Sequence, residues 1–273
     1  MSQPLLLAVL GDPVEHSLSP RIHSAFGQQF GLSVDYRKIQ TTPEQLVDRL
    51  KQLSDAGAQG VNLTVPLKGT GIRLCQYIDG PARRARAVNT LHWQDNGWSG
   101  HNTDGPGLRM DLERLGVTVA DRRVLILGAG GATAGILGPL LDADPAAVLL
   151  LNRTPERAEE MAERFAHLGP IAGAGLEAAD RDPRMADFDL LIQATSAGHD
   201  SQLPLLRRNW LKREASIYDL NYGPAHNALL RWATAFDLPC HDGLGMLVGQ
   251  AALAFEIWTG QRPALEPVLE RLR

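Results

Sequence analysis

The feature that most restricts the fold is the segment VLILGAGG at residues 124–131, where an apolar run leads directly into glycines. The run predicts a buried strand, and the residues after it predict a helix. A glycine turn between a strand and a helix lets the backbone approach a pyrophosphate at the helix N-terminus. Thr133 stands where the common GxGxxG pattern has its third glycine, so a glycine-rich turn without a ligand is the alternative. The predicted cofactor contacts of this turn are Gly128, Ala129, Gly130, Gly131 and Ala132.

Apolar runs of strand length alternate with amphipathic helical patterns along the chain. Ahead of the glycine turn, the sequence predicts strands at 5–10, 36–39 and 60–66, helices at 19–30 and 43–56, and a hairpin over 88–100. From residue 104 onward, it predicts helices at 104–115, 155–168, 226–236 and within 242–260, and strands at 124–127, 147–152, 188–195 and 216–221. Strands that alternate with crossover helices in a chain of 273 residues predict an α/β fold with two domains.

Charge, cysteine content and the N-terminal segment argue against several classes of function. The net charge is −4 and no basic block stands out, so nucleic acid binding is not expected. Cys75 and Cys240 lack CxxC spacing, and the histidines are scattered, which predicts no metal site and a reducing compartment. The apolar run at 5–10 spans only six residues, so we expect no signal peptide or membrane span and predict a cytoplasmic protein.

The end of the strand at 147–152 favours one nicotinamide cofactor over the other. Enzymes that use NAD commonly place a carboxylate there to bind the ribose 2′-hydroxyl. This chain has Asn152, Arg153 and Thr154 instead, and a guanidinium can pair with a 2′-phosphate. The sequence therefore predicts NADP. Arg157, one turn later, is either a second phosphate contact or a solvated surface charge.

A lysine and an aspartate in the first half of the chain are candidates for proton transfer. Lys68 follows the strand in VNLTVPLK, at the carboxyl end, where open parallel sheets bind ligands. A lysine beside a carboxylate can exchange a proton with a substrate oxygen while a hydride moves. Asp104 is the candidate carboxylate, although from sequence alone it is equally a helix N-cap.

Two hydroxyls lie at the start of the first predicted helix. Ser17 and Ser19 in HSLSP could hold a substrate carboxylate together with backbone donors. The alternative is that Ser19 only caps the helix.

Eight segments together resemble the shikimate dehydrogenase family along almost the whole chain. They are GDPVEHSLSPRIH, VNLTVPLK, AVNTL, HNTDGPG, GAGGAT, NRT, ATSAG and DGLGMLVGQAALAFEIW. The resemblance implies a substrate domain at 1–103 plus 242–273, with a mostly parallel sheet, and a Rossmann-type NADP-binding domain at 104–241. It also implies that the last helices return to the first domain.

The resemblance further implies roles for individual residues. Lys68 and Asp104 would be the catalytic pair, with Lys68 the proton donor in the direction of reduction. The substrate contacts would be Ser17, Ser19, Thr64, Asn89, Tyr222 and Gln250. The neighbours of the nicotinamide would be Ala194, Thr195, Leu220, Gly243 and Met246.

The implied reaction is the reversible reduction of 3-dehydroshikimate to shikimate by NADPH, in a monomer or homodimer. The alternatives are a quinate/shikimate or amino-shikimate dehydrogenase, and a non-catalytic NADP-binding regulator. The chain departs from the family's usual pattern at Gln193, where NATS reads QATS, and at GPAHNALL after Tyr222.

Overall fold

The computed structural model describes residues 3–177, 179, 182, 184–195, 203 and 205–273. The predicted ATSAG segment therefore lies outside the described residues from Ser196 onward. The chain forms two compact units, residues 1–108 with 247–273 and residues 109–246. The two boundaries between these units fall within helices. Each boundary lies slightly later in the sequence than the corresponding domain end, predicted at 103 or 241.

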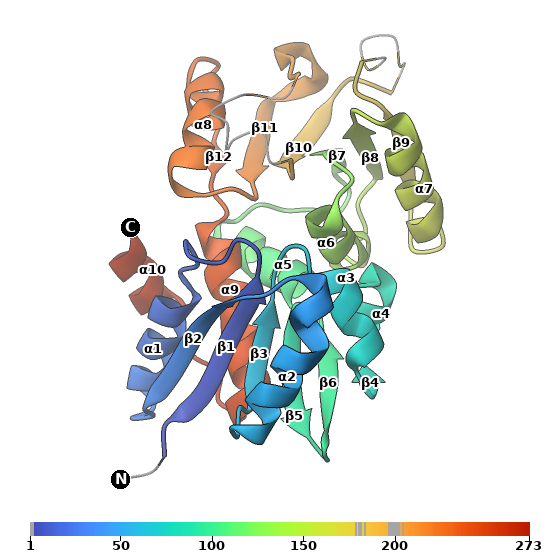
Figure 1. The fold of residues 1–273 in the computed structure, drawn as a ribbon. Helices are drawn as coiled ribbons and strands as arrows, with labels where there is room; N and C mark the ends of the chain where they lie inside the picture. The colour runs from blue at the N-terminus through green and yellow to red at the C-terminus, as the bar shows by residue number, and fades with distance from the viewer. Residues whose placement is uncertain (1–2, 178, 180–181, 183, 196–202, 204) are drawn as a thin grey trace. The chain divides into compact units, whose positions relative to one another are not determined.

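The first unit is built on a six-stranded mixed sheet with the order β2-β1-β3-β5-β6-β4 (Figure 1). Its strands are β1 (Leu5–Gly11), β2 (Val34–Gln40), β3 (Gly60–Leu63), β4 (Tyr77–Ile78), β5 (Thr90–Gln94) and β6 (Gly97–His101). Strands β1, β2 and β3 are parallel, and β5 and β6 form the predicted antiparallel hairpin. Asp95 and Asn96 both have positive φ in its turn, as a two-residue type I′ hairpin requires.

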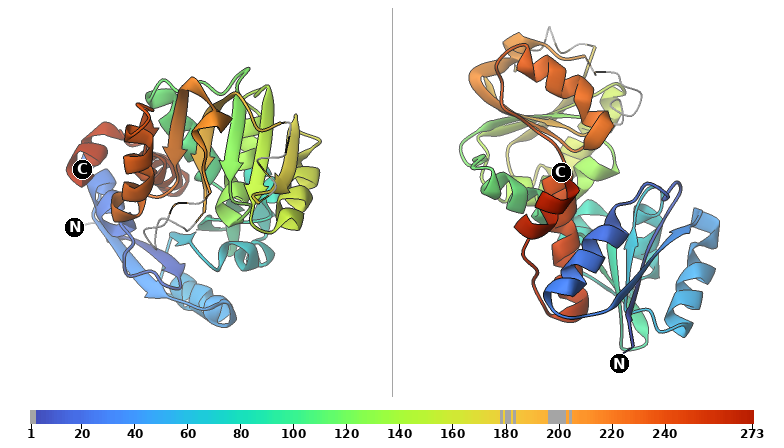
Figure 2. Two further views of the ribbon diagram at one scale, coloured as in Figure 1. Left: turned by 90° about the horizontal axis from the view of Figure 1, so that it is seen from above. Right: turned by 90° about the vertical axis from the view of Figure 1, so that its left-hand side faces the viewer.

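Helices cover both faces of this sheet (Figure 2, right). They are α1 (Ser19–Gln29), α2 (Leu46–Asp55), α3 (Lys68–Gly71), α4 (Gly80–Ala85), the start of α5 (Asp104–Arg114), most of α9 (Leu244–Thr259) and α10 (Glu266–Leu272). Short 3-10 turns are η1 (Pro43–Gln45) and η2 (Ile72–Leu74). Alternate β1 side chains face opposite ways, so Ala8 and Leu10 pack with the leucines of α2, while Leu7 packs with Trp258 of α9.

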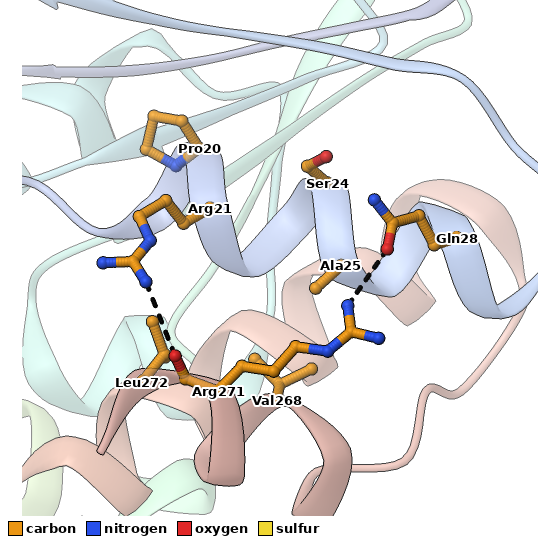
Figure 3. Close-up of a pocket in the computed structure, with 8 residues that line it drawn as sticks. All are labelled: Pro20, Arg21, Ser24, Ala25, Gln28, Val268, Arg271 and Leu272. Carbon is orange, nitrogen blue, oxygen red and sulfur yellow. Dashed lines mark hydrogen bonds between the residues drawn. The ribbon is translucent and has the colours of Figure 1, made fainter.

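The end of the chain returns to the first unit, as predicted. Helix α10 lies beside α1, and Arg271 donates a 3.0 Å hydrogen bond from Nη1 to Oε1 of Gln28 (Figure 3). The shallow pocket between these helices includes none of the predicted site residues. Trp258 of α9 also donates from Nε1 to the carbonyl oxygen of Leu91, over 2.9 Å.

The second unit contains a fully parallel sheet with the order β12-β11-β10-β7-β8-β9 (Figure 1). Its strands are β7 (Arg123–Leu127), β8 (Ala147–Asn152), β9 (Ile171–Gly175), β10 (Phe188–Gln193), β11 (Leu211–Asp219) and β12 (Cys240–His241). Its helices are α6 (Gly131–Leu141), α7 (Pro155–Phe165) and α8 (Asn227–Thr234), with 3-10 turns η5 (Arg208–Trp210) and η6 (Gly223–His226). Near-continuous apolar strands and crossover helices are typical of such a sheet, which confirms the predicted α/β class.

Candidate active site

Polar side chains of the first unit gather at the carboxyl ends of β1 and β3. Leu10 and Leu63 are in register on these parallel strands, so the residues that follow them share one edge of the sheet. A Cβ atom on Gly11 would lie 2.2 Å from Cγ2 of Thr64, which explains why a glycine ends β1. This edge therefore holds Thr64, and Lys68 begins α3 just beyond it.

Lys68 and Asp104 form an ion pair of 2.6 Å between Nζ and Oδ2. The two side chains are 22% and 9% exposed, so the pair is largely shielded from bulk water. The other carboxylate oxygen of Asp104 accepts a 2.8 Å hydrogen bond from Nδ2 of Asn89. Asp104 is the first residue of α5, and its carboxylate binds Lys68 and Asn89. The side chain therefore does not act as the N-cap, which was the alternative role predicted for it.

Gln250 joins this cluster from α9. Its Oε1 accepts hydrogen bonds from Nδ2 of Asn89 over 3.3 Å and from Oγ1 of Thr103 over 3.4 Å. Sequence reasoning did not select Thr103, which is buried and also donates its backbone N–H to Oδ1 of Asn89. Its position inside the polar run HNTDG, directly before Asp104, is the sequence feature that could have identified it as a site residue.

The two predicted serines are hydrogen bonded to each other at the start of α1. Ser17 Oγ donates to Ser19 Oγ over 3.1 Å, and the backbone N–H of Ser19 donates to Ser17 Oγ over 3.3 Å. The predicted capping role of Ser19 is wrong, because Leu18 is the N-cap and no side chain caps the helix. The hydroxyl of Ser19 instead accepts the hydrogen bond from Ser17.

The glycine turn of the second unit leads from β7 into α6. Gly128 has φ +103°, and a Cβ atom there would lie 3.0 Å from Cγ2 of Thr195. Gly130 is the N-cap of α6 and contributes no capping side chain. Added Cβ atoms on Gly130 and Gly131 would meet nothing within 4 Å. The turn thus combines open space with the amide donors of a helix N-terminus, which suits a pyrophosphate.

The predicted 2′-phosphate contacts follow β8. Asn152 accepts the backbone N–H of Ala129 at Oδ1 over 3.3 Å, which ties the end of β8 to the glycine turn. Thr154 is the N-cap of α7, and Arg153 and Arg157 are both exposed. Among the described residues, neither guanidinium has a hydrogen-bonding or ionic partner. Both positive charges are therefore available to an anionic ligand.

The predicted nicotinamide neighbours are tied together by Asn221. Its Nδ2 donates to the carbonyl oxygen of Thr195 over 3.1 Å, and its own carbonyl accepts the N–H of Gly243 over 2.9 Å. A Cβ atom on Gly243 would lie 2.3 Å from the carbonyl oxygen of Leu220. Residues that follow β10, β11 and β12 are thus held at one edge of the sheet.

Four predicted or divergent residues of the second unit lie at the end of β10, just after β10 or β11, or in the first turn of α9. Ala194 directly follows β10 and donates its N–H to the carbonyl of Leu127 over 2.9 Å. Gln193, the departure from the family pattern, is buried and binds Thr195 through both ends of its amide. Met246 lies in the first turn of α9, and Tyr222 is half-buried, which raises the pKa of its phenol.

The described residues form neither a candidate metal site nor a candidate membrane span. No group of three or more His, Cys, Asp or Glu side chains is arranged to hold a metal ion. No described helix has both the length and the apolar character that crossing a membrane requires. Cys75 and Cys240 are free thiols.

A parallel sheet with a glycine turn, joined to a second α/β unit that carries a lysine–aspartate pair, defines the class of two-domain dehydrogenases with a Rossmann-type unit. Family models match in three stretches: the shikimate dehydrogenase substrate binding domain at residues 9–91, shikimate / quinate 5-dehydrogenase at 111–218, and the shikimate 5′-dehydrogenase C-terminal domain at 243–273. The chain belongs to the shikimate dehydrogenase family.

Individual relatives agree with this family. The chain is 44% identical over 270 residues to the shikimate dehydrogenase (NADP(+)) of Thioalkalivibrio sulfidiphilus, with 97% of each chain covered. It is 43% identical over 276 residues to that of Methylococcus capsulatus, covering 100% of this chain and 97% of the relative. The solved shikimate 5-dehydrogenase of Thermus thermophilus in complex with NADP(H) and shikimate is 36% identical, has a TM-score of 0.86 and is matched over 97% of both chains.

Proposed function

We propose that this protein is an NADP-dependent shikimate dehydrogenase that catalyses the reversible reduction of 3-dehydroshikimate to shikimate. The observation that carries the proposal is the 2.6 Å Lys68–Asp104 pair, held by Asn89 and Gln250. Membership of the family supports the substrate and the cofactor. In this proposal the first unit binds the substrate and the second binds NADP.

Bound NADPH would supply the hydride, and the chain must supply one proton to the carbonyl oxygen. Lys68 donates that proton in the direction of reduction and accepts it in the direction of oxidation. Asp104 orients the ammonium group of Lys68 through the ion pair. Lys68 keeps 22% of its side chain exposed, which allows water to restore the proton after each turnover.

The remaining predicted contacts divide between the two ends of the substrate. Ser17 and Ser19 donate hydroxyl hydrogens to the carboxylate, and Tyr222 assists. Thr64, Asn89 and Gln250 bind the ring hydroxyls. On the cofactor side, the guanidinium of Arg153 is exposed and has no partner in the described part of the chain, which supports a preference for the 2′-phosphate of NADP.

The test is steady-state oxidation of shikimate with NADP and with NAD, by the wild type, Lys68→Ala and Asp104→Asn. We expect turnover with NADP by the wild type and a severe loss in both variants. Near-wild-type turnover by both variants would contradict the assigned pair. Quinate as a second substrate distinguishes a quinate/shikimate enzyme, while tight NADPH binding without turnover identifies a regulator.

Two properties of the whole protein complete the proposal. We propose a cytoplasmic location, which the free state of both cysteines supports. The protein is proposed to be a monomer or a homodimer, and light scattering of the purified chain distinguishes the two.

A further inference from the structure

Asn221, which follows β11, joins two neighbouring segments of the second unit, although no predicted site includes it. Its side-chain Nδ2 donates to the carbonyl oxygen of Thr195, after β10, over 3.1 Å. Its own carbonyl oxygen accepts the backbone N–H of Gly243, after β12, over 2.9 Å. Thr195 also borders the glycine turn, since a Cβ atom on Gly128 would lie 3.0 Å from its Cγ2. Asn221 therefore holds two residues at the edge of the sheet where such folds bind their cofactors.

A buried carboxylate sets the orientation of the Asn221 amide. Asp219, the last residue of β11, is 1% exposed. Its Oδ1 accepts the backbone N–H of Asn221 over 3.0 Å and Nδ2 of the same residue over 2.9 Å. An amide NH2 has two hydrogens, so Nδ2 gives one to Asp219 and the other to Thr195. The opposite orientation would place the amide oxygen against two acceptors. The carboxylate thus determines which end of the amide faces Thr195.

His226, in the segment GPAHNALL that departs from the family pattern, binds the second oxygen of this carboxylate. The imidazole is buried, and its Nδ1 lies 3.1 Å from Oδ2 of Asp219. On its other side, Nε2 lies 3.9 Å from Sγ of Cys240. Burial and the charges of Asp219 and Asp242 raise the pKa of this thiol to about 12, so the sulfur keeps its hydrogen and can donate it to Nε2. With Nε2 as an acceptor, the ring hydrogen is on Nδ1 and points at the carboxylate.

We propose that Asn221 is a positioning residue for the nicotinamide end of NADP, and that Asp219 and His226 hold it in place. This inference rests on the proposed function and on the nicotinamide neighbours that the family resemblance implies, among them Thr195 and Gly243. His226 acts through Asp219, because removing a donor from a buried carboxylate leaves an oxygen unsatisfied and allows the carboxylate to rotate away from Asn221.

The test separates the nicotinamide end of the cofactor from its adenosine end. Asn221→Leu keeps the approximate size of the side chain and removes its amide, so the bond to Thr195 is lost. We expect kcat for shikimate oxidation to fall by about 10- to 100-fold, as for a misaligned reacting group. The Kd of NADPH should rise, while the Kd of adenosine 2′,5′-bisphosphate, which lacks the nicotinamide, should not change. Asn209→Leu is the matched control, because Asn209 is exposed in η5, and it should behave as the wild type.

Two variants of His226 test its part in holding Asn221. His226→Asn keeps an N–H donor at the place of Nδ1, whereas His226→Leu has none. We expect His226→Leu to lower kcat less than Asn221→Leu does, and His226→Asn to recover most of the loss. Because His226 acts through Asn221, the double variant of the two leucine substitutions should have the kcat of Asn221→Leu alone.

The inference is overturned by a wild-type kcat in Asn221→Leu, by an equal rise in the Kd of NADPH and of adenosine 2′,5′-bisphosphate, or by effects that multiply in the double variant. Thermal unfolding midpoints are measured alongside, and Asn221→Ala replaces a leucine variant that does not fold. A wild type that binds NADPH without oxidising shikimate would overturn the proposed function, and the two Kd values would then decide this inference. A wild type that does not bind NADPH would overturn both.

Discussion

Nζ of Lys68 lies 2.6 Å from Oδ2 of Asp104, although 36 residues separate them in sequence. The pair forms because Lys68 begins α3 after β3, while Asp104 begins α5 after β6, and both strands belong to one sheet. Asn89 binds the second carboxylate oxygen, so Asp104 has a fixed orientation toward the lysine.

Replacing Lys68 by alanine should affect turnover more than substrate binding. General acid–base groups typically contribute about 10²- to 10⁴-fold, so we expect kcat for shikimate oxidation to fall by roughly that factor while KM changes little. Lys51→Ala is the matched control, because Lys51 forms an exposed 2.7 Å pair with Asp55 on α2. A kcat for Lys68→Ala close to that of this control would contradict the proton-transfer role.

Arg153→Ala should weaken NADP binding and leave NAD binding nearly unchanged. A hydrogen bond to a charged group contributes about 1.5–3 kcal/mol, which corresponds to a rise in KM for NADP of roughly tenfold or more. Arg157→Ala, measured in parallel, decides whether the second arginine is a phosphate contact or a surface charge. Arg109→Ala provides a control, since this exposed residue pairs with Glu113 instead. An equal rise in KM for NADP and NAD would argue against recognition of the 2′-phosphate.

Two glycine variants should separate folding from cofactor binding. Gly128→Ala forces a side chain into φ +103° beside Thr195, so it should cost about 1–3 kcal/mol of stability as well as NADP affinity. Gly130→Ala meets nothing within 4 Å, so it should unfold like the wild type but bind NADP more weakly. Urea unfolding and NADPH fluorescence titration measure the two quantities. Unchanged NADPH affinity in Gly130→Ala would remove this turn from the proposed binding site.

His23 should make the protein less stable in acid. Its pKa is lowered from 6.5 to about 3 by burial, so the folded chain keeps it neutral while the unfolded chain takes up a proton. The resulting loss is small above pH 6.5 and grows as the pH falls toward 3, by up to about 1.4 kcal/mol per pH unit. His23→Phe should retain the stack on Tyr36 and show a flatter fall in urea stability between pH 6.5 and 4. Parallel curves for both proteins would contradict this role.

Much of the fold follows from local patterns in the sequence. The apolar strands, the glycine turn and the hairpin at Asp95-Asn96 each depend on neighbouring residues, and the structure has them where they were predicted. Among the described residues, the short elements α3, β4, α4, β9 and β12 were not predicted. Strand β9 reads IAGAG and has no β-branched residue after its first position. A Cβ atom on Gly173 would lie 2.3 Å from the carbonyl oxygen of Ala158, so this glycine lets α7 pack closely against the strand.

The candidate site was only partly predictable. Lys68 and Asp104 come shortly after two strands of one sheet, β3 and β6. Residues that follow the carboxyl ends of such strands lie at the same edge of the sheet, which brings the two side chains together. The hydrogen bonds that join Asn89, Thr103 and Gln250 gave no comparable signal, because they link residues far apart in sequence. Capping was the alternative role predicted for Ser19 by local preference, but Leu18 is the N-cap and the hydroxyl of Ser19 bonds to that of Ser17.

The return of α9 and α10 to the first unit has a consequence for synthesis of the chain. Trp258 covers Gly60 and Leu7 and bonds to the carbonyl of Leu91, so the sheet of the first unit lacks part of its apolar cover until α9 has been synthesised. The second unit is continuous in sequence and has all of its strands before that moment. The first unit can therefore complete its core only after the second unit has been synthesised, and we expect a nascent chain stalled before residue 258 to expose an incomplete core to chaperones.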